Sequence, residues 1–75
     1  MPVAFVLINT EIGSEEEVLQ ALKKVKGVEE AHIVFGGFDI VAKIQARSVD
    51  ELKEIVTLHI RRLNKVTLTQ TLFAS

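Results

Sequence analysis

The apolar residues of this chain follow a strand-like spacing in four segments, and this pattern constrains the fold more than any other feature. Residues 3–8 are apolar without interruption, which in so short a segment is typical of a central strand covered on both faces. Residues 38–46 and 66–73 alternate in the manner of strands, and residues 28–35 form the remaining apolar segment. We therefore expect four β-strands.

Two segments between the predicted strands carry the signals of helices. A Ser-x-x-Glu capping box opens each of them, at Ser14–Glu17 and at Ser48–Glu51. Glu15 and Glu16 lie within the first box and lysines precede Gly27, so we expect a helix over residues 15–26. An apolar stripe that includes His59 follows the second box, so we expect a helix over residues 49–63.

The resulting order is β-α-β-β-α-β, which is the order of the ferredoxin-like α+β arrangement. Right-handed crossovers place the first and third strands in the middle of a four-stranded antiparallel sheet, with both helices on one face. The other face would keep apolar side chains from the first strand and from Val41 and Phe73. A 75-residue chain without cysteine has a marginal core of its own, so we expect a second copy to pack sheet to sheet as an obligate dimer.

The hairpin Phe35-Gly36-Gly37-Phe38-Asp39 joins the second and third predicted strands. Two glycines between apolar runs predict a two-residue reverse turn, because glycine accepts positive φ angles. Backbone N–H groups beside a carboxylate could hold both ends of a zwitterion, with Asp39 taking the ammonium group. The alternative is an ordinary hairpin with a solvated aspartate.

The charge balance argues against several classes of partner. Nine basic residues face ten acidic ones, for a net charge of −1, so the chain has no basic footprint for direct contact with nucleic acid. No apolar run approaches the ~20 residues that cross a bilayer, and no leader-like segment opens the chain, so we expect a cytoplasmic protein that does not bind membranes.

Catalytic, metal-binding and cofactor-binding patterns are missing from the sequence. There is no cysteine or tyrosine, Ser14 and Ser48 are the expected helix caps, and Ser75 is the last residue. His32 and His59 belong to different predicted elements, without the ligand spacing of a metal site. The glycine pair is too short for a phosphate-binding loop. We expect no catalytic residue, no metal and no cofactor.

Three segments together resemble the effector-binding domain of Lrp/AsnC regulators, also called the RAM domain. They are Lys-Gly-Val-Glu-Glu-Ala at 26–31, Phe-Gly-Gly-Phe-Asp-Ile at 35–40, and residues 63–72. The resemblance covers residues 1–75 as a single ligand-binding domain and leaves no room for the family's DNA-binding domain. It implies a stand-alone version, a sheet-to-sheet homodimer, assembly of dimers into a ring such as an octamer, and amino-acid effectors bound where dimers meet.

The sequence departs from the family pattern in the hairpin and before the last strand. Phe38 stands where a tyrosine is usual, and this removes a hydroxyl that could orient a ligand. Gly37 stands where a polar residue is more frequent, and Asn64-Lys65 replaces the common Pro-Gly. These differences leave the identity of the amino acid open.

The resemblance and the hairpin chemistry together predict a ligand site. Asp39 would receive the α-ammonium group of an amino acid. The other expected contacts are backbone N–H groups at Gly36, Gly37 and Phe38, hydroxyls at Thr69 and Thr71, and apolar walls at Ile33 and Val34. Thr69 and Thr71 also have a plain interpretation as β-branched residues suited to a strand.

The leading hypothesis is therefore a non-enzymatic, amino-acid-sensing regulatory domain that acts by mixed assembly with full-length Lrp/AsnC relatives or by buffering the free amino acid. The alternative is a small enzyme of the dimeric α/β-barrel type, such as a monooxygenase or isomerase, with His32, His59 or Asp39 as acid or base. A third possibility is an oligomerisation module that binds no ligand.

Overall fold

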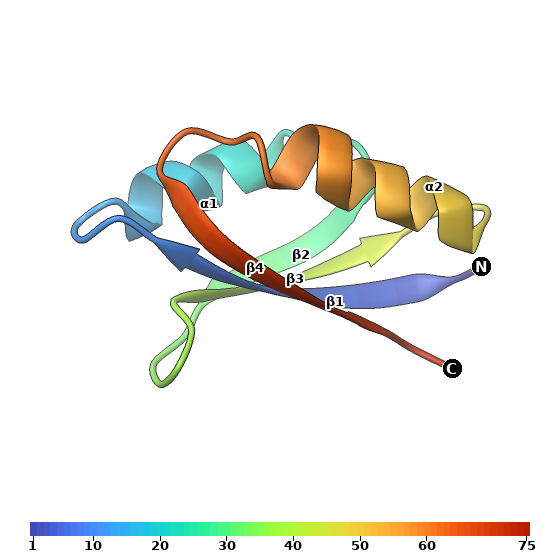
Figure 1. The fold of residues 1–75 in the computed structure, drawn as a ribbon, viewed down its shortest axis with the longest axis horizontal. Helices are drawn as coiled ribbons and strands as arrows, with labels where there is room; N and C mark the ends of the chain where they lie inside the picture. The colour runs from blue at the N-terminus through green and yellow to red at the C-terminus, as the bar shows by residue number, and fades with distance from the viewer.

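A computed structural model describes residues 1–75 as a four-stranded sheet with helical segments on one of its faces (Figure 1). In chain order the elements are β1 Val3–Thr10, α1 Glu15–Lys23, β2 Val28–Ile33, β3 Ile40–Gln45, α2 Val49–Glu54, η1 Ile55–Ile60 and β4 Val66–Phe73. The strand order is β2-β3-β1-β4, and every neighbouring pair is antiparallel. The predicted ferredoxin-like fold is confirmed.

The core lies between the sheet and the helices. Alternate residues of the two central strands point into it, including Val6 and Ile8 of β1 and Ile44 of β3, all fully buried. Leu22 of α1 and Leu52 of α2 meet them from the helical layer and are fully buried as well. Burial of one such leucine stabilises a fold by about 1.5–3 kcal/mol, so this single layer holds the chain together.

The first helix begins at Glu15 as predicted, but its cap and its end differ from the prediction. The Ser14 side chain makes no cap hydrogen bond, so the predicted capping box is not formed. Glu17 instead accepts a hydrogen bond from the Lys65 Nζ atom at 3.1 Å. The helix ends at Lys23 rather than at residue 26, because the chain must turn before β2 and Gly27 adopts a φ of +99° in that turn.

The second helical segment begins as predicted and then changes type. Ser48 Oγ accepts from the Glu51 N–H at 3.1 Å, which confirms the cap. Residues Ile55–Ile60 form a π-helix, in which the Arg61 N–H donates to the Val56 carbonyl at 2.9 Å. The wider turn directs Ile55 and Ile60 inward and leaves His59 exposed, so the prediction that His59 belongs to the apolar stripe is wrong.

The sheet face opposite the helices, here called the open face, carries apolar side chains. Residues opposite each other in an antiparallel pair share a face, and Phe5 lies opposite Leu72. Leu68 and Leu72 are 57% and 48% exposed there, and Val41 joins this face as predicted. Phe73 lies opposite the buried Ala4 and so belongs to the helix side, contrary to the prediction.

Candidate ligand-binding site

The connection between β2 and β3 is a wide loop rather than a two-residue turn. It comprises residues 34–39 and is closed by a hydrogen bond of 2.8 Å from the Val34 N–H to the Asp39 carbonyl. Only Gly36 of the glycine pair has a positive φ, +138°. The loop projects from the sheet on the side away from the helices (Figure 1), and Phe35 within it is 99% exposed.

Asp39 is half-buried at the base of this loop and is anchored to β1. Its Oδ2 atom accepts from the Thr10 N–H at 2.9 Å and lies 3.4 Å from the Thr10 hydroxyl. The pairing of β1 with β3 ends at Ile8 and Ile40, so the carboxylate satisfies a Thr10 N–H group that the sheet leaves unpaired. The Oδ1 atom makes no hydrogen bond within the chain. One carboxylate oxygen is therefore available to a ligand.

Backbone donors lie close to Asp39 in the sequence of the loop. The N–H groups of Gly36, Gly37 and Phe38 make no hydrogen bond within the chain. A methyl group added at Gly36 or Gly37 would meet no atom within 4 Å. This part of the loop is therefore bare backbone, with free donors in open space beside a carboxylate.

The predicted hydroxyl groups lie elsewhere in the chain. Thr69 and Thr71 of β4 are opposite Ile8 and Val6 of β1, so their side chains point to the helix side of the sheet. Strand β1 separates them from β3, which sets β3 and β4 about 10 Å apart. The loop of residues 34–39 projects to the other side (Figure 1). A single chain therefore does not bring Thr69 and Thr71 to Asp39.

The two predicted apolar contacts lie at the start of the same connection as Asp39. Ile33 ends the edge strand β2, points to the helix side opposite Ile40, and is 37% exposed. Val34 follows it and is half-buried. Both side chains keep accessible surface beside the loop.

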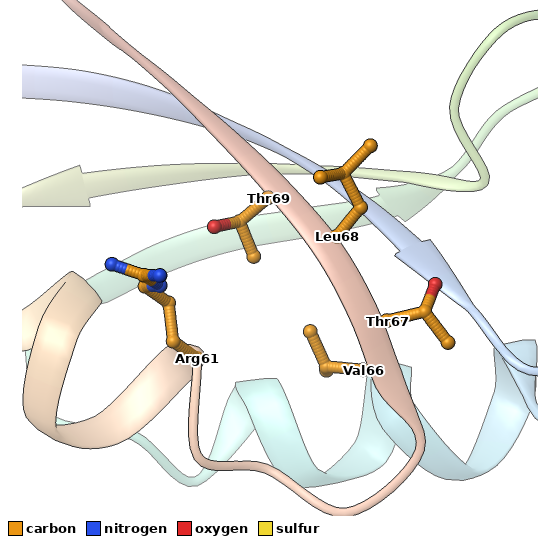
Figure 2. A pocket seen from close by; sticks show the side chains of 5 residues that line it. All are labelled: Arg61, Val66, Thr67, Leu68 and Thr69. Atoms are coloured by element: carbon orange, nitrogen blue, oxygen red, sulfur yellow. The ribbon is translucent and has the colours of Figure 1, made fainter.

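Thr69 lines a small hollow at the sheet edge, shown in Figure 2. Its volume is about 190 Å³, and its other lining residues are Arg61, Val66, Thr67 and Leu68. The Arg61 guanidinium and the Thr69 hydroxyl lie on the same side of β4 (Figure 2). Sequence reasoning missed Arg61, because an arginine in the last turn of a helix is explained by the helix dipole alone. Its proximity to β4 has no signal in the sequence.

A larger hollow of about 470 Å³ contains none of the predicted site residues. It lies where the turn before β2 meets the second helical segment, and Lys26, Arg47, Glu54 and His59 are among its lining residues. Its floor is tight, because a Cβ atom at Gly27 would lie 2.6 Å from Ile55 Cδ1. Both acidic and basic side chains line this hollow.

The groups named for the enzyme alternative do not converge. His32 lies on edge strand β2, where its Nε2 atom is 2.9 Å from Glu30 Oε1, and this hydrogen bond lowers the pKa of the exposed Glu30 carboxyl. His59 lines the larger hollow beside the second helical segment, and Asp39 is bonded to Thr10. No group of three His, Cys, Asp or Glu residues is placed to hold a metal ion.

None of the helices is long and apolar enough to cross a membrane.

Comparison with known proteins identifies relatives across the whole length of the chain. The family model described as the Lrp/AsnC ligand binding domain matches residues 3–75. The HTH-type transcriptional regulator PF0250 of Pyrococcus furiosus is 38% identical over 72 residues, which are 92% of this chain and 48% of that protein. This chain thus spans about half the length of the curated relatives it matches.

Solved structures show the same fold. TTHA0845 from Thermus thermophilus is 35% identical, with a TM-score of 0.94 over 100% of this chain and 94% of that one. The protein FFRP-DM1 is 32% identical, with a TM-score of 0.94 and full coverage of both chains. Escherichia coli AsnC is 24% identical, with a TM-score of 0.90 over 97% of this chain and 50% of AsnC, and shares the fold. The chain belongs to the Lrp/AsnC ligand-binding domain family.

Proposed function

We propose that this chain is a non-enzymatic regulatory domain that binds a free amino acid. The observation that carries the proposal is the pairing of one free Asp39 oxygen with three free backbone N–H groups at residues 36–38. A carboxylate oxygen accepts hydrogen bonds from an ammonium group, and bare N–H groups donate to a carboxylate. The loop thus offers complementary partners to both charged groups that every amino acid carries.

The proposed site is completed between copies of the chain. Thr69 and Thr71 are separated from the loop by the sheet, so their hydroxyls reach a ligand at Asp39 only from another copy. The open face supplies the first contact between copies, since Phe5, Leu68 and Leu72 leave more apolar surface there than a solvated face carries. Dimers built on that face would then meet with the loop of one copy against the β4 threonines of another, in a ring such as an octamer, with the effector at the dimer–dimer contact.

Two structures with this fold were solved with an amino acid. They are NMB0573 of Neisseria meningitidis with L-methionine, at a TM-score of 0.86 and 14% identity, and Rv3291c of Mycobacterium tuberculosis with L-methionine, at 0.81 and 23%. At those identities the comparison establishes only that this chain shares their fold. These complexes support the proposal that a protein with this fold binds an amino acid, while the ligand of this chain depends on its own residues.

The regulatory output follows from assembly. The curated relatives are HTH-type transcriptional regulators about twice as long as this chain. We propose that residues 1–75 act as a single ligand-binding domain that joins full-length Lrp/AsnC relatives in mixed oligomers. An amino acid would change the formation of mixed oligomers only if it binds one assembly more tightly than another.

The test is a calorimetric screen of the twenty amino acids against the wild-type protein and Asp39→Asn. Asparagine keeps an oxygen for the Thr10 N–H but removes the negative charge, so the fold is retained while the ammonium partner is lost. We expect one amino acid or a small group to bind, and the variant to bind it at least about tenfold more weakly.

Asp50→Asn is the matched control, because Asp50 is exposed in the first turn of α2 and lies outside the loop. Its affinity should equal that of the wild type. Absence of binding by all twenty amino acids, or equal affinity in the Asp39 variant, would remove the proposed function.

A further inference from the structure

The hollow beside β4 gathers hydrogen-bond donors and a positive charge. Arg61 and Thr69 both line it, and none of its lining residues is acidic (Figure 2). The Arg61 guanidinium takes part in no ion pair or side-chain hydrogen bond within the chain. Its five N–H donors are therefore all available to a group that enters the hollow.

The edge of the sheet adds a backbone donor. The Ala74 N–H donates to the Val3 carbonyl of β1. The direction of the N–H groups alternates along a strand, so every second residue from Ala74 to Leu68 also points its N–H group toward β1. The N–H group of Thr69 then points outward from the edge of the sheet. A guanidinium, a hydroxyl and a backbone N–H thus border the same hollow. A carboxylate is the group that such a set binds best, because its two oxygens match the planar fork of arginine.

The size of the hollow limits what enters it. Sites for whole small molecules usually have about 300–1,000 Å³, and this hollow has about 190 Å³. It therefore accommodates one functional group of a ligand, while the rest of the ligand lies outside. Thr69 belongs both to this hollow and to the proposed effector site, which makes the hollow a subsite of that site.

We infer that this hollow receives the side-chain carboxylate of the effector, and that the effector is an acidic amino acid, aspartate or glutamate. The inference rests on the proposed function, in which the loop N–H groups of one copy take the α-carboxylate and Asp39 takes the α-ammonium. Arg61 and Thr69 of another copy then face the far end of the ligand. Arg61 is the residue that sets specificity.

The test compares near-isosteric ligands: aspartate with asparagine, and glutamate with glutamine, by calorimetry. The wild type should prefer an acid over its amide by at least about tenfold, as for a charge-assisted hydrogen bond at a site enclosed by a second copy. Arg61→Gln should abolish that preference. Arg62→Gln is the matched control, since Arg62 is an exposed neighbour that does not line the hollow, and it should keep the preference.

Each other outcome overturns the inference. Equal binding of acids and amides by the wild type, or an unchanged preference in Arg61→Gln, excludes Arg61 from side-chain recognition. A uniform loss for all amino acids in Arg61→Gln would assign Arg61 to the α-carboxylate instead. If Arg61→Gln changes the oligomeric state but keeps the preference for acids over amides, Arg61 instead pairs with an acidic residue of another copy.

These failures are distinct from failure of the proposed function. If amino acids bind and Asp39→Asn weakens them, but acids are not preferred, only the inference about Arg61 falls. If no amino acid binds at all, both fall. Circular dichroism of both arginine variants checks that each exposed substitution leaves the fold intact.

Discussion

At the scale of single residues, Asp39 combines a structural contact with a free binding group. One oxygen accepts from the Thr10 N–H just beyond the last β1–β3 pair, and the other makes no hydrogen bond within the chain. Fixing one oxygen orients the second, because the carboxylate is planar. A ligand that binds there meets a group whose position is already set, which reduces the entropy lost on binding.

This double role predicts different effects for two substitutions at Asp39. Asp39→Ala leaves the partly buried Thr10 N–H without a partner, whereas Asp39→Asn keeps an oxygen in place. We expect the alanine variant to be less stable than the asparagine variant by about 1–3 kcal/mol. Urea denaturation followed by circular dichroism measures this difference. Equal stability of the two variants would show that the contact with Thr10 contributes nothing.

At the scale of the elements, the two helical segments begin in different ways although both start with Ser-x-x-Glu. Ser48 has extended backbone angles and accepts from the Glu51 N–H, while Ser14 is buried and its side chain makes no cap bond. Glu17 is engaged by Lys65, at the turn that leads into β4, rather than by its own helix. A tertiary contact thus replaces the local one.

The contrast predicts unequal effects of one substitution at the two positions. Ser48→Ala should lower the free energy of unfolding by about 1 kcal/mol, because the Glu51 N–H loses its acceptor. Ser14→Ala should change it by less, since no cap bond is lost. Thermal melts of both variants at equal concentration measure the two effects. A larger loss at Ser14 than at Ser48 would contradict this description of the helix starts.

The sequence predicted the elements well where periodicity governs them. The strand order, the common face of the helices and the bounds of β4 follow from apolar spacing and right-handed crossovers. It failed where packing between distant segments decides. The π-helix, the early end of α1 and the side of the sheet on which Phe73 lies depend on tertiary contacts that local spacing does not encode.

The candidate site was predictable only in part for the same reason. The glycines and Asp39 lie within four residues of one another, so the sequence predicted backbone donors beside a carboxylate. It did not predict the wide loop or the hydrogen bond from the Thr10 N–H to Asp39. Arg61 and Thr69 line the same hollow only because the second helical segment ends beside the start of β4. No spacing rule relates those two residues.

At the level of the whole molecule, a complete ligand site needs more than one copy of the chain. The open face leaves Phe5, Leu68 and Leu72 exposed, and the loop and the β4 threonines lie on opposite sides of the sheet. Sheet-to-sheet packing would cover the apolar residues of the open face. Contact between dimers would bring the loop of one copy to the β4 threonines of another. Ligand binding and assembly are then linked, because a ligand held by two copies favours the state in which they meet.

The most direct measurement of this claim mixes two variants that are each defective in binding. Asp39→Asn lacks the ammonium partner, and Thr69→Val with Thr71→Val lacks the hydroxyls. Co-refolded in equal amounts, they should regain wild-type affinity at about a quarter of the sites, where an intact Asp39 from one copy meets intact threonines from another. Calorimetry on the mixture that shows no restored sites, while each variant alone is folded and assembled, would contradict a site shared between copies.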